Sequence, residues 1–178
     1  MKNFIVILCF LLLGCYACEK QENVSIPPIT AENTFSCKID GEVFIQKEHG
    51  GFLKTEDGLK VNLLANNTWK INLGDGNHDL FIYLSNIPSS GSINIEQSDG
   101  DLDFFEEERN LIELNDRNTN KVFYSLFKSK AITIKSFTSR ENLIFEFGEI
   151  ILLNSENSSD TIELSQGKLN INLEILNE

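Results

Sequence analysis

A strict alternation of apolar and polar residues is the pattern that most limits how this chain can fold. It is clearest near the C-terminus, where Leu169, Ile171, Leu173 and Ile175 are separated by single polar residues. Successive side chains of a β-strand point to opposite faces of the sheet, so this pattern predicts a strand with one buried and one solvated face.

Similar runs recur from Thr34 onward, at spacings of about ten to twelve residues. They cover residues 34–39, 43–45, 59–65, 68–73, 79–85, 92–96, 121–128, 131–137, 143–153, 160–165 and 168–176. Turn-forming residues separate them, including Asp40-Gly41, Gly74-Asp75-Gly76 and Gln166-Gly167. Asp-Gly between two alternating runs favours a type I′ hairpin turn, because both central residues then need positive φ. About ten short strands spaced in this way predict an all-β fold, an antiparallel sandwich or barrel, and of the two we expect a β-sandwich.

One segment departs from the alternation. Residues 103–115 could form a short helix, because Phe104, Leu111 and Ile112 would then share a face, but a loop or an irregular strand fits equally well. We therefore expect at most one short helix or irregular segment near 103–115.

The N-terminus has the features of an export signal. Lys2 precedes an unbroken apolar run, Phe4–Leu13. As a helix this run would span about 15 Å, half of a hydrocarbon core of about 30 Å, so it is too short to cross a membrane. A positive start followed by a short apolar run is typical of a secretory signal peptide. We expect a signal peptide at 1–14, a polar tether containing Pro27-Pro28 at 15–33, and the β-domain at 34–178.

The end of the apolar run resembles the lipobox of bacterial lipoproteins. Leu12-Leu13-Gly14 precedes Cys15, and in lipoproteins the equivalent cysteine becomes the acylated N-terminus after cleavage. Cys15 is therefore the predicted lipidation site, and Cys18 is the alternative. Several acyl chains would anchor the protein durably, since each buried CH₂ contributes about 0.8 kcal/mol. Cys18 could also pair with Cys37 after export, but we favour Cys37 as a small buried hydrophobe.

The charge balance disfavours nucleic acid as a partner. Lys plus Arg number 15 and Asp plus Glu number 27, giving a formal net charge of −12, whereas nucleic-acid binding requires a basic face. The spacing of His49 and His78 fits no common zinc motif, and no nucleophile elbow is present. We therefore expect no enzymatic activity.

The acidic stretch between Glu96 and Asp116 is the candidate metal site. Asp99, Asp101 and Asp103 place oxygen ligands at every second residue, as at the start of a calcium loop. An EF-hand would continue with Gly and then Glu where this chain has Phe104 and Asn110, so a solvated charge run is the favoured interpretation and Ca²⁺ the alternative.

Two further features are candidate glycan sites of different kinds. Phe104 and Phe105 lie among acidic residues and are the aromatic pair most expected to be exposed, which would provide a platform for a sugar ring. An aromatic anchor that holds this loop to the core is the favoured interpretation, and the sugar platform is the alternative. Asp160-Thr161-Ile162 is similar to a three-residue acceptor site for O-glycosylation in Bacteroidota, which would place a glycan on Thr161.

Several strand and turn sequences resemble a family of Bacteroidota lipoproteins of unknown function. They are residues 34–44, 80–84, 91–93, 131–134, 143–147 and 161–169. The resemblance implies a β-sandwich on an outer-membrane anchor and brings no catalytic residues. The expected function is a lipid-anchored, non-enzymatic binding or accessory module of the cell envelope. A glycan- or calcium-dependent surface binding protein and a structural subunit of an envelope complex are the alternatives.

Overall fold

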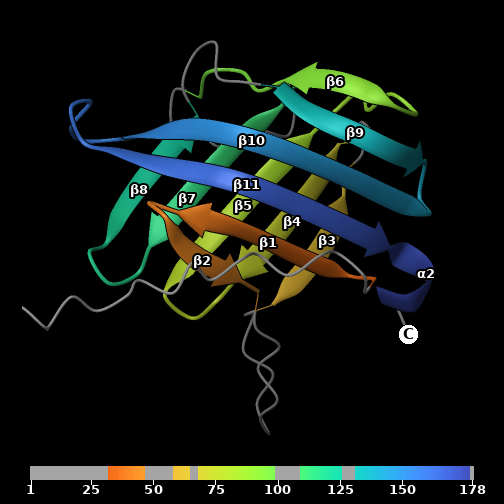
Figure 1. Cartoon of the computed structure of the whole chain (residues 1–178), viewed down its shortest axis with the longest axis horizontal. Helices are drawn as coiled ribbons and strands as arrows, with labels where there is room; N and C mark the ends of the chain where they lie inside the picture. The colour runs from red at the N-terminus through yellow and green to blue at the C-terminus, as the bar shows by residue number, and fades with distance from the viewer. Residues whose placement is uncertain (1–31, 47–57, 65–67, 99–108, 126–130, 177–178) are drawn as a thin grey trace, which may run out of the picture.

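Eleven antiparallel strands make up almost all the regular structure of the described residues (Figure 1). The structure is a computed structural model, and it describes residues 32–46, 58–64, 68–98, 109–125 and 131–176. The elements are β1 (Thr34–Ile39), β2 (Glu42–Ile45), β3 (Leu59–Leu63), β4 (Trp69–Gly74), β5 (His78–Leu84), β6 (Gly91–Asn94), β7 (Leu111–Asp116), β8 (Lys121–Ser125), β9 (Ala131–Thr138), β10 (Asn142–Asn154), β11 (Thr161–Asn172) and the helix α2 (Leu173–Leu176). The predicted all-β, antiparallel fold is confirmed.

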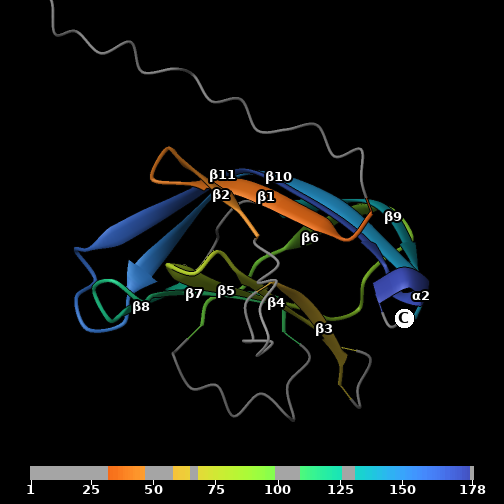
Figure 2. The same ribbon diagram turned by 90° about the horizontal axis from the view of Figure 1, so that it is seen from below.

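A single sheet forms both layers of the domain. Its strand order is β2-β1-β11-β10-β8-β7-β5-β4-β3, and β9 joins β6 to β10. The long strand β10 pairs with β9 at Asn142–Glu146 and with β8 at Leu152–Asn154. Figure 2 shows β1, β2, β10 and β11 in one layer above β3, β4, β5 and β7 in the other. The two layers of the expected sandwich thus come from one sheet curled into a half-barrel.

The apolar residues of the alternating runs meet between the layers. Trp69, Ile71 and Leu73 of β4 are at most 2% exposed, and Leu143 and Phe145 of β10 belong to the same core. Burying a large apolar side chain contributes about 1.5–3 kcal/mol, so this core supplies most of the drive to fold. The ring of Trp69 lies edge-on to that of Phe137, with centroids 5.7 Å apart.

The hairpin of β1 and β2 has the expected tight turn. Asp40 and Gly41 have φ angles of 47° and 84°, and Ile39 pairs with Glu42 across the two-residue loop. These are the positive φ values that a type I′ turn requires, so the Asp-Gly prediction is confirmed.

The turn predicted at Gln166-Gly167 is wrong, because β11 continues through these residues. Ser36 of β1 pairs with Lys168 and Lys38 pairs with Ser165, which leaves one extra residue on β11. Gln166 has a φ of 54° at this β-bulge. The buried positions change from even numbers, such as Leu164, to odd numbers, such as Leu169. This change of phase makes one strand look like two in the sequence.

The strand predicted for 168–176 ends earlier than its alternation suggests. Residues 173–176 form one helical turn, in which Leu173 is buried and Ile175 is 52% exposed. The side-chain oxygen of Asn172 accepts a hydrogen bond from the backbone N–H of Glu174 at 3.1 Å, as a helix-capping asparagine does. The capping residue therefore overrides the alternation of apolar residues at the C-terminus.

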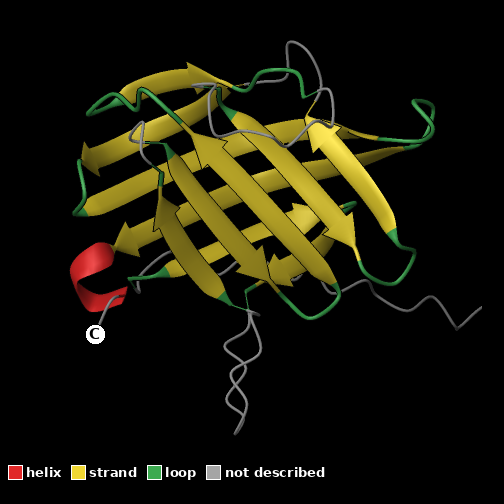
Figure 3. Cartoon of the chain, turned by 180° about the vertical axis from the view of Figure 1, so that it is seen from behind, coloured by secondary structure: helices red, strands yellow, loops and turns green. Residues whose placement is uncertain are grey.

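The C-terminal part of the 103–115 segment is a strand and not a helix. β7 lies between β5 and β8 in the layer that faces the viewer in Figure 3. Leu111, Ile112, Glu113 and Leu114 are all buried, so both faces of the strand are covered and no alternation marks it. Residues 103–108 lie outside the described residues.

Candidate functional site: a cavity between the two layers

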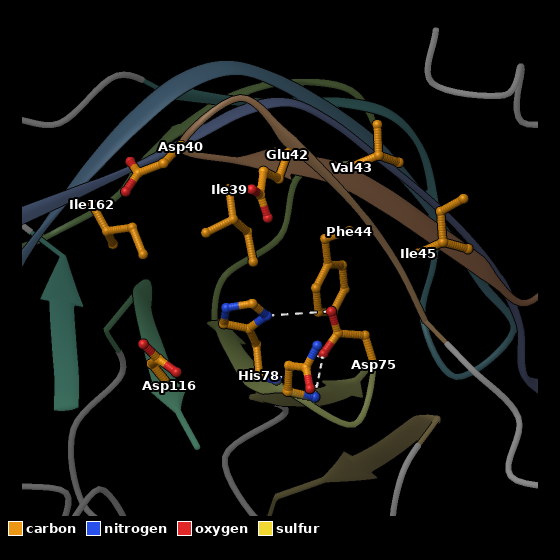
Figure 4. A pocket seen from close by; sticks show the side chains of 11 residues that line it. Ile39, Asp40, Glu42, Val43, Phe44, Ile45, Asp75, His78, Asp116 and Ile162 are labelled. Atoms are coloured by element: carbon orange, nitrogen blue, oxygen red, sulfur yellow. Dashed lines mark hydrogen bonds and ion pairs between the residues drawn. The ribbon is translucent and has the colours of Figure 1, made fainter. Parts of the chain in front are cut away.

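A cavity of about 530 Å³ lies between the layers at one end of the half-barrel (Figure 4). The β1–β2 hairpin forms one wall, and the β4–β5 turn with the end of β7 forms the other. The apolar lining residues are Ile39, Val43, Phe44, Ile45 and Ile162, and the polar ones are Asp40, Glu42, Asp75, Asn77, His78 and Asp116. The volume is within the range of small-molecule sites, about 300–1,000 Å³.

The hairpin presents both apolar and acidic groups to the cavity. Ile39 and Phe44 point inward and are almost completely buried. Glu42 pairs with Ile39, so its side chain lies on the same face of the sheet. At the open end of the layers this inward face is not covered, and Figure 4 shows Glu42 directed toward His78. The edge strand β2 thus places a carboxylate beside the apolar side chains of Ile39 and Phe44, which form the apolar ceiling of the cavity.

Asp75 organises the opposite wall. One of its side-chain oxygens accepts hydrogen bonds from the backbone N–H groups of Asn77 and His78, at 2.8 and 2.7 Å. The other oxygen lies 3.2 Å from Nδ1 of His78. This side-chain-to-backbone pattern explains why the Gly74-Asp75-Gly76 turn is tight and holds the imidazole in one orientation.

Asp116 supplies a second fixed carboxylate beside His78. The two residues are directly opposite in the β5–β7 ladder. Burial acts to raise the pKa of Asp116. Hydrogen bonds from the Thr119 side chain and from the backbone N–H groups of Asn118 and Thr119 outweigh that effect, together with the charge of His78. The pKa of Asp116 therefore lies below its usual range, and the group stays ionised at neutral pH.

The cavity is strongly electronegative with an apolar ceiling. Four carboxylates line it, and His78 is the only basic side chain among the described lining residues. The ring of Phe44 lies 6.4 Å from the ring of His78, centroid to centroid, so the two walls approach each other at these side chains. The arrangement suits a ligand that carries positive charge on a small apolar body.

Most site residues expected from the sequence lie outside the described residues. These are Cys15, Cys18, Asp99, Asp101, Asp103, Phe104 and Phe105, and His49 also lies outside them. Thr161 is described: it is the exposed first residue of β11. Its neighbour Asp160 accepts hydrogen bonds from Lys121 and Asn154, both at 2.8 Å.

Cys37 and Trp69 have structural roles. Cys37 is completely buried with a free thiol, and burial, followed by the charge of Asp75, raises its pKa. The preference for a buried hydrophobe over a disulfide agrees with this environment. Trp69 is 2% exposed, as its place in an alternating run indicated.

Comparison with known proteins gives no match to a family model, to a curated protein or to a solved structure. The resemblance to Bacteroidota lipoproteins therefore stays a prediction. Within the described part of the chain, no group of three or more His, Cys, Asp or Glu side chains could hold a metal ion. Among the same residues no helix is long and apolar enough to cross a membrane.

The sequence pattern gave little indication of the cavity. Its polar residues come from two turns and from the ends of β2, β5 and β7, which are far apart in the chain. The one local signal is the i, i+3 spacing of Asp75 and His78 at a glycine-flanked turn. That Asp116 joins them depends on β7 pairing with β5, which the alternation of residues did not reveal.

Proposed function

We propose that the protein is an exported, lipid-anchored binding module of the outer membrane, and that it does no chemistry on its ligand. The membrane part of the proposal rests on the sequence: a short apolar signal, and Cys15 directly after it, with Cys18 as the alternative anchor. The membrane is thus one partner, through the N-terminal lipid, and the tether separates it from the domain.

The ligand in this proposal is a small organic cation with an apolar body, held in the cavity between the layers. The observation that carries the proposal is the combination of four carboxylates and an apolar ceiling around about 530 Å³. A protonated amine would meet Asp75, Asp116 and Glu42, and its apolar body would lie against Phe44 and Ile39. The lining carboxylates carry negative charge and His78 is the only basic side chain among the described lining residues, so a cation is the ligand charge that the cavity attracts.

Binding is a better fit than catalysis because of how the acidic groups are held. Asp75 and Asp116 accept hydrogen bonds from the backbone of their own turns. The lowered pKa of Asp116 makes it a fixed negative charge and unsuited to donate a proton as a general acid near neutral pH.

The test is calorimetric titration with three probes of equal length: n-hexylamine, n-hexanol and n-hexanoate. We expect n-hexylamine to bind and n-hexanoate not to bind, with weaker binding at higher salt because the attraction is screened. Asp116→Asn should weaken n-hexylamine binding by about three- to tenfold, or about 0.7–1.4 kcal/mol. Glu156→Gln removes an exposed carboxylate away from the cavity and is the matched control.

Two results would overturn this function. Equal binding of the amine and the alcohol would show that charge has no part in recognition. Equal weakening by Asp116→Asn and Glu156→Gln would show that only the net charge of the protein matters. No cofactor is part of the proposal, and a parallel titration with Ca²⁺ and with EDTA tests calcium-dependent binding at Asp99, Asp101 and Asp103.

The sugar platform and the structural role that the sequence suggests have tests of their own. A glycan array with Phe104→Ala plus Phe105→Ala tests the predicted sugar platform. Crosslinking in cells tests whether the protein is a structural subunit of an envelope complex, and recovery as a monomer alone would count against that role.

A further inference from the structure

The outer face of the β3–β4–β5 layer carries a second, smaller pocket, on the opposite side of the sheet from the cavity. Its volume is about 130 Å³, and it is lined by Lys60, Asn72, Leu73, Asp79, Phe81 and Arg117. An engineered apolar cavity of about 150 Å³ holds one benzene ring, so this smaller pocket has room for part of a six-membered ring. Figure 3 shows this face of the sheet.

The pairing of the strands places these groups side by side. Lys60 of β3 pairs with Asn72 of β4, and Asn72 pairs with Phe81 of β5. Directly paired residues share a face of the sheet, so the Lys60 amine, the Asn72 amide and the Phe81 ring lie in a row. Lys70 lies over the rings of Phe81 and Tyr83 and is paired with Tyr83 across the two strands. The pocket lies on the other side of Phe81, toward Asp79, so Lys70 is not one of its lining residues.

A rigid ion pair forms one rim of the pocket. Nε and Nη2 of Arg117 donate hydrogen bonds to the two carboxylate oxygens of Asp79, at 2.7 and 2.6 Å. Such a bidentate pair fixes both side chains, so the planar guanidinium of Arg117 lies in a defined orientation beside the Phe81 ring.

The same face has acceptor oxygens that lack donors. The side-chain oxygens Oδ1 of Asn72 and Oδ1 of Asn115 are buried and have no hydrogen-bond partner among the described residues. Asn115 pairs with Asp79, which places it on the neighbouring strand of the same face. Buried polar atoms without partners are uncommon in native proteins, and a bound group that donates hydrogen bonds is one explanation for them.

We propose that this outer pocket binds the ring of a neutral sugar. A pyranose has an apolar C–H face that would stack on Phe81, and its hydroxyl groups both donate and accept hydrogen bonds. They would accept a hydrogen bond from Lys60, and they would donate one to Oδ1 of Asn72 once this buried amide turns toward the pocket. A carboxylate ligand could not donate to the Asn72 oxygen, and a simple cation would meet the positive charges of Lys60 and Arg117. The proposal does not depend on the cavity or on its cationic ligand.

The experiment is saturation-transfer NMR on the full folded chain with a panel of methyl pyranosides: glucoside, galactoside, mannoside and N-acetylglucosaminide. We expect at least one of them to give a signal with the unaltered protein. Phe81→Leu keeps an apolar side chain but removes the ring, and it should reduce the signal at least about fivefold. Tyr124→Leu removes an aromatic ring on the same face outside the pocket and should leave the signal unchanged.

Several results would overturn the proposal. They are no signal with any pyranoside, an undiminished signal with Phe81→Leu, or equal losses with Phe81→Leu and Tyr124→Leu. If Phe81→Leu does not fold, Asn72→Ala provides the same test through the hydrogen bonds. Excess n-hexylamine should not displace the sugar, and displacement would place the sugar in the cavity between the layers and contradict the outer site.

Discussion

Gly167 is the position where the continuity of β11 can be tested most sharply. It pairs with Phe147 in the β10–β11 ladder, and its backbone is covered by the Phe147 ring. A Cβ atom added to Gly167 would overlap three ring carbons of Phe147. Gly167→Ala therefore forces the ring out of a place where it is 4% exposed and neighbours the rings of Phe35 and Phe145.

The expected cost of this change is about 1–3 kcal/mol, the usual range for overpacking a core. Phe147→Ala alone should cost about 3–5 kcal/mol through the cavity that it leaves. In the Phe147→Ala background the added methyl group meets no ring, so Gly167→Ala should cost little there. The two changes should thus be coupled by about 1–3 kcal/mol.

Urea unfolding followed by Trp69 fluorescence measures these differences. With a slope of about 2 kcal/mol per M, a loss of about 2 kcal/mol lowers the midpoint by about 1 M. Gly148→Ala is the matched control, because a Cβ there meets nothing within 4 Å. Its midpoint should stay unchanged or rise slightly, since alanine reduces the freedom of the unfolded chain.

A Gly167→Ala variant as stable as Gly148→Ala would refute this placement of the Phe147 ring. That outcome is the one expected if residues 166–167 formed the turn that the sequence suggests, because no ring would then cover Gly167. Additive effects of Gly167→Ala and Phe147→Ala would likewise show that the two residues do not touch.

Glu113, Cys37 and Cys15 each support a further prediction. Burial raises the pKa of Glu113, so the protonated group favours the fold below its ordinary pKa of 4.5 and loses that contribution as pH rises. Glu113→Gln should therefore raise the urea midpoint at pH 7 but not at pH 4. An equal effect of the substitution at both pH values would contradict this prediction. Cys37 is buried with a raised pKa, so its thiol should not react in the folded protein. Mapping of thiol labels by mass spectrometry should find Cys37 unlabelled in the folded protein and labelled in urea. Rapid labelling without urea would show that β1 opens. Cys15→Ser should lose the acyl mass and the detergent-phase partitioning of the native protein; retained lipid would identify Cys18 as the anchor, and absence of lipid from both forms would remove the membrane from the proposal.

The fold class could be predicted because alternation is a local property of each strand. The Asp40-Gly41 hairpin shows the same locality, since its turn type follows from two residues. Predictions were wrong where the alternation of residues is overridden, once by strand pairing and once by a local helix cap. The bulge at Gln166 shifts the phase of β11, and the capping residue Asn172 starts a helix despite an alternating sequence.

The cavity could not be predicted, because it depends on the order of strands in the sheet. Asp75 and His78 are close in sequence, but Phe44 and Asp116 reach them only through the curl of the sheet and the pairing of β5 with β7. β7 itself was hard to recognise, since Glu113 and its neighbours are buried on both faces. Strand order is set by long-range packing, which a single sequence reveals only weakly.

The cavity between the layers is the ligand site in our account of this protein. Its most direct test is a ¹H–¹⁵N NMR titration of the protein with n-hexylamine. We expect the shifted backbone signals to cluster on the β1–β2 hairpin, on residues 75–78 and on Asp116. Shifts confined to the exposed turn at 155–159, which contains Glu156, or no saturable shift at all, would contradict this assignment.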